Sequence, residues 1–174
     1  MTAAVISGTR IRAVVLTVSD GVHAGTRIDK SGPALVERLR AAGFTAPDPA
    51  VLPDERDQIA NWLREVVRCK AGDVVFTTGG TGVAPRDVTP EAVRDVIDRE
   101  IPGFGELMRQ SGRESTPLAS LSRGMAGVAG HVLIVTLPGS PKGALESLGA
   151  ILELVPHVHD LLSGRTAHEM PRQA

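Results

Sequence analysis

The residue types that could do chemistry in this 174-residue chain gather in short segments that follow apolar runs. The sharpest is segment 77–82, which reads Thr-Thr-Gly-Gly-Thr-Gly. Glycine lets a backbone approach a ligand closely and adopt positive φ. Consecutive N–H groups in such a loop can form an anion nest, and threonine hydroxyls add further donors. The segment predicts a phosphate-binding loop, with a tight strand-to-helix turn as the alternative. The residues expected to contact phosphate are Thr78, Gly79, Gly80, Thr81 and Gly82.

This glycine loop differs from the two most familiar phosphate-binding motifs. No Gly-Lys-Ser or Gly-Lys-Thr ends it, which excludes a Walker A loop. Gly80 and Gly82 are followed by Pro85, which does not fit the dinucleotide-binding GxGxxG pattern.

Two aspartates are expected at the same place in the fold. Asp87 follows the glycine loop, and a carboxylate there can hold a Mg²⁺ that bridges phosphate oxygens. Asp54, in segment 52–55, is the second candidate for a metal-binding or phosphate-positioning carboxylate. The alternative for either aspartate is a cap at the start of a helix. Arg86 is expected to neutralise phosphate charge, with a solvated surface arginine as the alternative.

A third segment, 137–142, reads Leu-Pro-Gly-Ser-Pro-Lys after the most apolar run of the chain. Its glycine and serine offer N–H and hydroxyl donors at the start of a helix, where anions are favoured. The alternative is a rigid turn stiffened by two prolines. The candidate binding residues here and after the first apolar run are Ser19, Asp20, Pro138, Gly139, Ser140 and Pro141. No Ser/His/Asp order indicates acyl transfer.

The elements that must position these residues alternate along the chain. Apolar runs at 13–18, 73–78 and 132–137 predict buried strands, and 50–52 predicts a weak strand at a sheet edge, because prolines precede it. Residues 125–135 predict a hairpin turning at Gly130. Amphipathic stretches between the strands predict helices, one of them capped by Ser31.

Strands separated by helices predict an α/β fold with a mostly parallel sheet covered by helices on both faces. In such folds the ligand lies at the carboxyl ends of the strands. The three polar segments all follow strands, so the pattern predicts that they meet in one site.

Composition narrows the classes of function. The net charge of −1 gives no basic field for nucleic acid, and an aromatic content of 2% leaves few stacking platforms. No stretch approaches the ~20 apolar residues of a membrane span. The single cysteine excludes an internal disulfide. We expect a soluble, cytoplasmic, single-domain protein (1–174, ordered core about 11–163) with a frayed tail at 171–174.

Eight segments together resemble the MogA/MoaB family of molybdenum cofactor biosynthesis. In chain order they are 18–21, 29–33, 52–55, 77–82, 86–90, 102–105, 121–123 and 137–141. The resemblance covers about Ile11 to Leu162 and implies a three-layer α/β/α domain that binds molybdopterin and assembles as a homotrimer. By motif match, Asp54 and Asp87 occupy the positions of the family's essential aspartates.

The activity that the resemblance implies is adenylylation of molybdopterin by Mg-ATP, which yields adenylyl-molybdopterin and pyrophosphate. The product then passes to the enzyme that inserts molybdate, so a transient contact with that enzyme is also implied. The alternative is a carrier or scaffold of the MoaB type that binds molybdopterin without catalysis. Nucleotidyl transfer fits the residues, because it requires positioning and charge neutralisation more than a covalent nucleophile.

Overall fold

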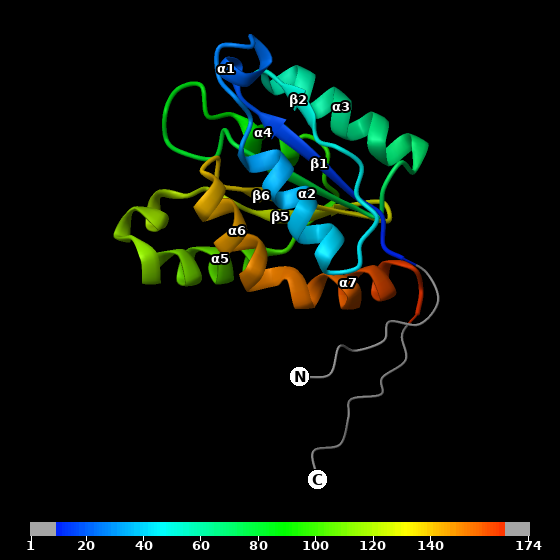
Figure 1. Ribbon diagram of the computed structural model, residues 1–174. Coiled ribbons are helices and arrows are strands. Elements are labelled where there is room, and N and C mark those ends of the chain that lie inside the picture. The colour runs from blue at the N-terminus through cyan, green and yellow to red at the C-terminus, as the bar shows by residue number, and fades with distance from the viewer. Residues whose placement is uncertain (1–9, 166–174) are drawn as a thin grey trace.

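The computed structural model describes residues 10–165, and the fraying expected at 171–174 lies outside this range. A six-stranded sheet in the order β2-β1-β3-β6-β5-β4 forms its centre (Figure 1). The strands are β1 (Ala13–Val18), β2 (Ala50–Leu52), β3 (Val74–Thr78), β4 (Arg99–Glu100), β5 (Ala126–Ala129) and β6 (Val132–Leu137).

The sheet is mostly parallel, as predicted. β1 pairs in parallel with β2 and β3, and β3 pairs in parallel with β6. β5 runs antiparallel to both β6 and β4. The β5–β6 hairpin turns at Gly130, whose φ of +57° suits glycine. β2 lies at the sheet edge, where the prolines before it do not interrupt a central ladder.

Helices cover both faces of this sheet, which confirms the three-layer prediction. In Figure 1, α2, α5, α6 and α7 lie on one side of the strands, and α3 and α4 lie on the other. The helices are α1 (Asp20–His23), α2 (Ser31–Ala41), α3 (Arg56–Cys69), α4 (Thr89–Arg94), α5 (Pro102–Ser115), α6 (Pro141–Ile151) and α7 (Val155–Leu162), with short 3₁₀ turns η1 (Pro117–Leu121) and η2 (Leu152–Leu154).

Two hydrophobic clusters form the core, one on each face. Leu35 of α2 and Leu148 of α6 pack with Phe76 on one face, and all three are fully buried. Leu63 of α3 packs with Ile134 on the other face. Burying each such side chain contributes roughly 1.5–3 kcal/mol, so both helical layers are fixed to the strands whose ends form the site. Within residues 10–165, none of the helices combines the length and apolar character that a bilayer crossing requires.

Candidate functional site

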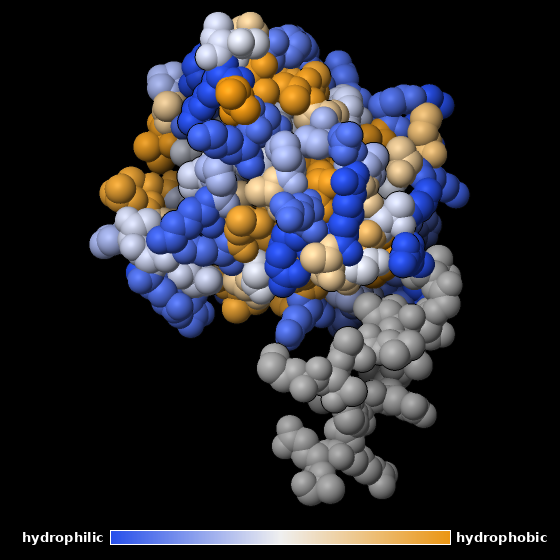
Figure 2. Space-filling model, in the orientation of Figure 1, coloured by the Kyte–Doolittle hydropathy of each residue, from blue (hydrophilic) through white to orange (hydrophobic). Residues whose placement is uncertain are grey.

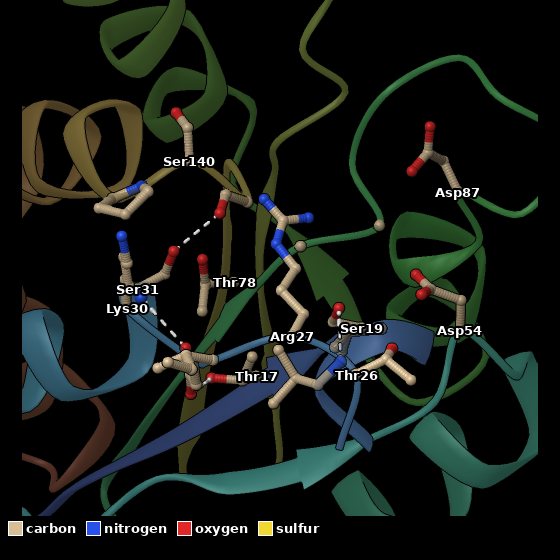
Figure 3. A pocket seen from close by; sticks show the side chains of 18 residues that line it. Thr17, Ser19, Thr26, Arg27, Lys30, Ser31, Asp54, Thr78, Asp87 and Ser140 are labelled. Carbon is tan, nitrogen blue, oxygen red and sulfur yellow. Dashed lines mark hydrogen bonds between the residues drawn. The ribbon is translucent and has the colours of Figure 1, made fainter. Parts of the chain in front are cut away.

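The carboxyl ends of β1, β3 and β6 open into a cavity of about 790 Å³ (Figure 3). β2 lies on one side of β1 and β3 on the other, so the chain changes direction across the sheet at this point. Such a switch point is where open α/β sheets bind ligands. The cavity falls within the range of small-molecule sites, about 300–1,000 Å³. The polar segments predicted to meet do meet here.

The glycine loop after β3 lines the cavity and is also required by the packing of the fold. Gly79 has a φ of +104°, and a Cβ there would lie 2.1 Å from Val18 O. Gly80 has a φ of +63°, and a Cβ there would lie 2.3 Å from Thr89 Oγ1 and 3.0 Å from Asp54 Oδ1. Real Cβ atoms do not approach so closely, so the interpretation as a tight turn is confirmed. The same loop forms a wall of the cavity, and phosphate binding by it stays a prediction.

Asp54 lines the cavity and forms two reciprocal hydrogen bonds with Asp20, each between a backbone N–H and a carboxylate oxygen. Asp20 N donates to Asp54 Oδ2 at 2.9 Å, and Asp54 N donates to Asp20 Oδ1 at 3.0 Å. Asp54 does not cap α3, because this helix begins after Glu55 and has no side-chain cap bond. Burial raises the pKa of Asp54, and the nearby carboxylates of Asp20 and Asp87 add to the rise, which the hydrogen bond from Asp20 N only partly offsets.

Asp87 also lines the cavity, and it closes a turn of its own loop. Its Oδ2 accepts from Ala84 N at 2.8 Å, and its N–H donates to Ala84 O at 2.9 Å. A helix cap is again excluded, because α4 begins after Val88 without a side-chain cap bond. A Cβ on Gly82 would lie 2.7 Å from Asp87 Oδ2, so the absence of a side chain at Gly82 leaves room for this carboxylate.

The donor set fits a Mg²⁺ ion shared with substrate phosphates. Within residues 10–165, Asp54 Oδ1 and Asp87 Oδ1 accept no hydrogen bond, so each carboxylate keeps one oxygen for a ligand. The same residues contain no group of three or more His, Cys, Asp or Glu side chains suited to a metal. Mg²⁺ in phosphate-transfer sites typically takes one or two carboxylates and completes its shell with phosphate and water.

Arg86 does not face the cavity. Its guanidinium donates to both carboxylate oxygens of Asp20, at 3.0 and 2.8 Å, and to Glu55 at 2.9 Å. These hydrogen bonds raise the pKa of Arg86 and, on the other side, lower the pKa of Asp20. The arginine thus joins the loops after β1, β2 and β3. Its positive charge is already paired with the carboxylates of Asp20 and Glu55, so it is not free to neutralise a phosphate.

Arg27 and Lys30 supply the positive charge of the cavity instead. Both line it, and within residues 10–165 neither forms an ion pair with an acidic side chain. In the view of Figure 3 the Arg27 guanidinium extends between Asp54 and Asp87 on one side and Ser140 on the other. The cavity therefore presents Asp54 and Asp87 at one side and the cations of Arg27 and Lys30 near its middle and opposite side.

Asp29 fixes the segment that carries these two cations. Thr17 Oγ1 donates to Asp29 Oδ2 at 2.7 Å. Asp29 Oδ1 accepts from the N–H groups of Ser31 and Gly32, at 3.1 and 3.0 Å, and so caps α2 in the role expected of Ser31. The Ser31 hydroxyl is used elsewhere, donating to Gly139 O at 2.7 Å. These bonds connect the loop after β1 to the turn after β6.

The structure brings most of the predicted site residues to one cavity but not all of them. Those that line it are Ser19, Asp54, Thr78, Gly79, Gly80, Asp87, Gly139, Ser140 and Pro141. Those that do not line it are Asp20, Thr81, Gly82, Arg86 and Pro138. The polar lining residues that sequence reasoning missed are Thr17, Thr26, Arg27, Asp29, Lys30 and Ser31. For Thr26, Arg27, Asp29 and Lys30 the available signal was their position between a buried strand and the start of a helix.

Comparison with known proteins shows which family the chain belongs to. Residues 14–157 match the family model described as a probable molybdopterin binding domain. A molybdopterin adenylyltransferase of Helicobacter pylori is 41% identical over 152 residues, covering 86% of each chain. The crystal structure of the molybdopterin biosynthesis enzyme MoaB from Thermus thermophilus is 48% identical, with a TM-score of 0.83, covering 88% of this chain and 97% of that one.

A longer relative contains a similar segment as a part of itself. Gephyrin of Dictyostelium discoideum is 36% identical over 167 residues, which cover 90% of this chain. The match spans only 23% of the gephyrin chain.

Proposed function

Because the chain belongs to the family of probable molybdopterin-binding domains, we propose that it is a molybdopterin adenylyltransferase of molybdenum cofactor biosynthesis. One observation carries the proposal: Asp54 and Asp87 line the same cavity as the glycine loop and two unmatched cations. This is the set of groups that nucleotidyl transfer requires, since the reaction depends on positioning and charge neutralisation. The adenylyltransferase of H. pylori, similar over most of both chains, supports the assignment.

The proposed reaction joins two phosphates. An oxygen of the terminal phosphate of molybdopterin attacks the α-phosphorus of ATP and forms a new phosphorus–oxygen bond. The bond between the α-phosphorus and the bridging oxygen to the β-phosphorus breaks, and pyrophosphate leaves. No residue of the chain becomes covalently modified. In agreement with this, the lining residues within 10–165 include no histidine that could activate a serine or threonine, and no cysteine.

Each side of the cavity has a proposed role. Asp54 and Asp87 would hold Mg²⁺, which would supply positive charge to neutralise the substrate phosphates. Arg27 and Lys30 neutralise the remaining phosphate charge, because both line the cavity and neither forms an ion pair with an acidic side chain within residues 10–165. The glycine loop brings its backbone close to the ligand. Gly139 and Ser140 offer donors near the start of α6.

The chain has few aromatic side chains that could stack on the purine ring of ATP or the pterin ring of molybdopterin. Among the described residues, 10–165, no aromatic side chain lines the cavity. Val22 and Ile28 line it, and Ile28 is 80% exposed. We therefore propose that purine and pterin are held by backbone hydrogen bonds and aliphatic contacts.

Two measurements distinguish the adenylyltransferase from the alternative, a carrier that binds molybdopterin without catalysis. Isothermal titration should detect binding of Mg-ATP, and pyrophosphate should be released from ATP only when molybdopterin is present. Binding of molybdopterin without nucleotide binding or pyrophosphate release would favour the carrier. Binding of neither ligand would refute both functions.

The assembly and setting are further parts of the proposal. We propose a homotrimer in the cytoplasm, formed by residues 1–174 as one domain, which passes its product to the molybdate-inserting enzyme. Three large apolar side chains on α5 and η1 are exposed and offer area for self-association: Leu107, Leu118 and Leu121. Hydrophobic residues gather at the left edge of Figure 2, the side on which α5 ends in Figure 1. Sedimentation showing a stable monomer of about 18 kDa at micromolar concentration would contradict the trimer.

A further inference from the structure

The guanidinium of Arg123 is bonded to both ends of the turn that carries Asp87. Its Nε donates to Gly82 O at 2.7 Å, and its Nη2 donates to Asp87 O. Its Nη1 donates to the carboxylate of Glu91, the acidic residue of the first turn of α4. The backbone N–H of Arg123 adds a bond to Thr81 O at 2.8 Å. One residue thus joins the two ends of the turn and the helix that follows them.

The backbone on either side of Arg123 is itself fixed to the core. Arg109 Nη1 donates to Gly124 O at 3.0 Å and lies 3.3 Å from Ser122 O. Met125 N donates to Thr136 Oγ1 at 2.8 Å, within the buried β5–β6 hairpin. Arg123 therefore extends from a rigid segment toward a loop that has no regular structure of its own between Gly79 and Val88.

Displacement of this turn would displace the Asp87 carboxylate with it. Asp87 Oδ2 accepts from Ala84 N, and Asp87 N donates to Ala84 O, so the carboxylate and the turn form one unit. On the solvent side the loop is held by the ion pairs of Arg86, whose side chain is 57% exposed. Exposed ion pairs contribute little to stability. The Arg123 side chain is 35% exposed and makes the more protected connection.

We propose that Arg123 is a positioning residue, which holds the Gly82–Asp87 turn so that the Asp87 carboxylate faces the cavity. This inference rests on the proposed function, in which Asp87 serves phosphate chemistry. Arg123 does not line the cavity and acts through Asp87. Arginine suits the role because its planar fork carries five N–H donors, whereas lysine has a single nitrogen that cannot reach three separated acceptors in this geometry.

The first test compares Arg123→Lys with Arg12→Lys. Arg12 bonds Asp73 Oδ1 at 2.8 Å and Lys70 O at 2.9 Å, at the end of the sheet away from the cavity, so it is a matched arginine with similar contacts. Arg123→Lys should lower kcat at least ~10-fold and raise the Mg²⁺ concentration for half-maximal rate, because even a ~1 Å misplacement can cost ~10²-fold. Molybdopterin affinity should not change. Arg12→Lys should leave the rate per folded molecule unaltered.

The second test does not depend on activity. Amide hydrogen exchange of the ligand-free protein should be faster at Ala84 and Asp87 in Arg123→Lys than in the wild type, with the amides of β3 unchanged. If Arg123→Lys does not fold, Glu91→Gln replaces it, with a smaller effect in the same direction.

The outcomes of the two tests separate this inference from the proposed function. Wild-type protein that makes no adenylyl-molybdopterin would refute the proposed function, while the exchange measurement would still decide whether Arg123 holds the turn. An unchanged rate and Mg²⁺ requirement in Arg123→Lys, or loop exchange equal to that of the wild type, would overturn the role of Arg123. Faster exchange at every amide alike would reduce it to general stability and would also overturn it.

Discussion

Replacing Asp54 by Asn separates the charge of this carboxylate from its hydrogen bond. The amide oxygen can still accept Asp20 N–H, which lies 2.9 Å from Asp54 Oδ2, but the negative charge beside the glycine loop is lost. Removing one preorganised electrostatic group typically costs about 10²–10³-fold in kcat, or ~2.7–4 kcal/mol. Because Asp87 remains in place, we expect the lower part of this range, about 10²-fold in the rate of adenylylation. Molybdopterin affinity should change much less.

The same substitution is expected to leave the fold equally stable or more stable at neutral pH. Burial and neighbouring carboxylates raise the pKa of Asp54, so ionising this carboxyl costs more in the folded chain than in the unfolded chain. An acid whose pKa rises on folding stabilises the fold below its unfolded value of about 3.9 and loses that contribution as pH rises through the folded pKa. At pH 7 the ionised carboxylate is therefore a cost that Asn does not carry. The Tm of Asp54→Asn should equal or exceed that of wild type at pH 7, and this difference should shrink on acidification.

Pyrophosphate release and thermal unfolding, measured on the same preparations, test both expectations. Asp57→Asn is the matched control, because Asp57 is an exposed acid in the first turn of α3 and does not line the cavity. It should leave the rate unaltered. If Asp54 had only a structural role through its hydrogen bond from Asp20 N, weakening that bond would cost ~1 kcal/mol, which lowers Tm by about 2–4 °C in a chain of this size. A wild-type rate together with such a lowered Tm would refute the reasoning.

Four further substitutions address the rest of the cavity. Asp87→Asn should lower the rate by about 10²-fold, measured as pyrophosphate release; an unaltered rate would remove this carboxylate from the chemistry. Gly82→Ala should lower the rate while circular dichroism shows an intact fold, because the new Cβ would lie 2.7 Å from Asp87 Oδ2 and the glycine φ is not left-handed; full activity would show that the placement of this carboxylate is unimportant. Arg27→Gln and Lys30→Gln should each weaken ATP or molybdopterin binding about 10-fold, or ~1.4 kcal/mol, and reduce its salt dependence in isothermal titration. Unaltered binding of both ligands would exclude these two cations.

The sheet and the position of its site could be predicted from the sequence because local patterns determine them. The apolar runs of β1, β3 and β6 are buried along their length apart from Val14, and each is followed directly by polar or glycine residues or by proline. The carboxyl ends of parallel strands meet at one edge, so strand order was not needed to bring Ser19, Thr78 and Ser140 together.

The charge arrangement of the site could not be predicted, because it depends on partners distant in sequence. Arg86 stands beside Asp87 along the chain, yet its guanidinium bonds Asp20, 66 residues away. Lys30 precedes a helix start, where a solvated head group is the ordinary expectation, and only the fold turns it into the cavity. The role of Arg123 depends in the same way on acceptors far from it in sequence, of which Gly82 O is 41 residues away.

The most direct test of the proposed activity follows the phosphates of ATP. The protein is incubated with molybdopterin, Mg²⁺ and ATP labelled at either the α- or the γ-phosphate, and the pterin product is separated. We predict that the α-label appears in the pterin product and the γ-label in pyrophosphate, and that Asp54→Asn forms little of either labelled product. Transfer of the γ-label to molybdopterin, or of neither label by wild-type protein, would contradict it.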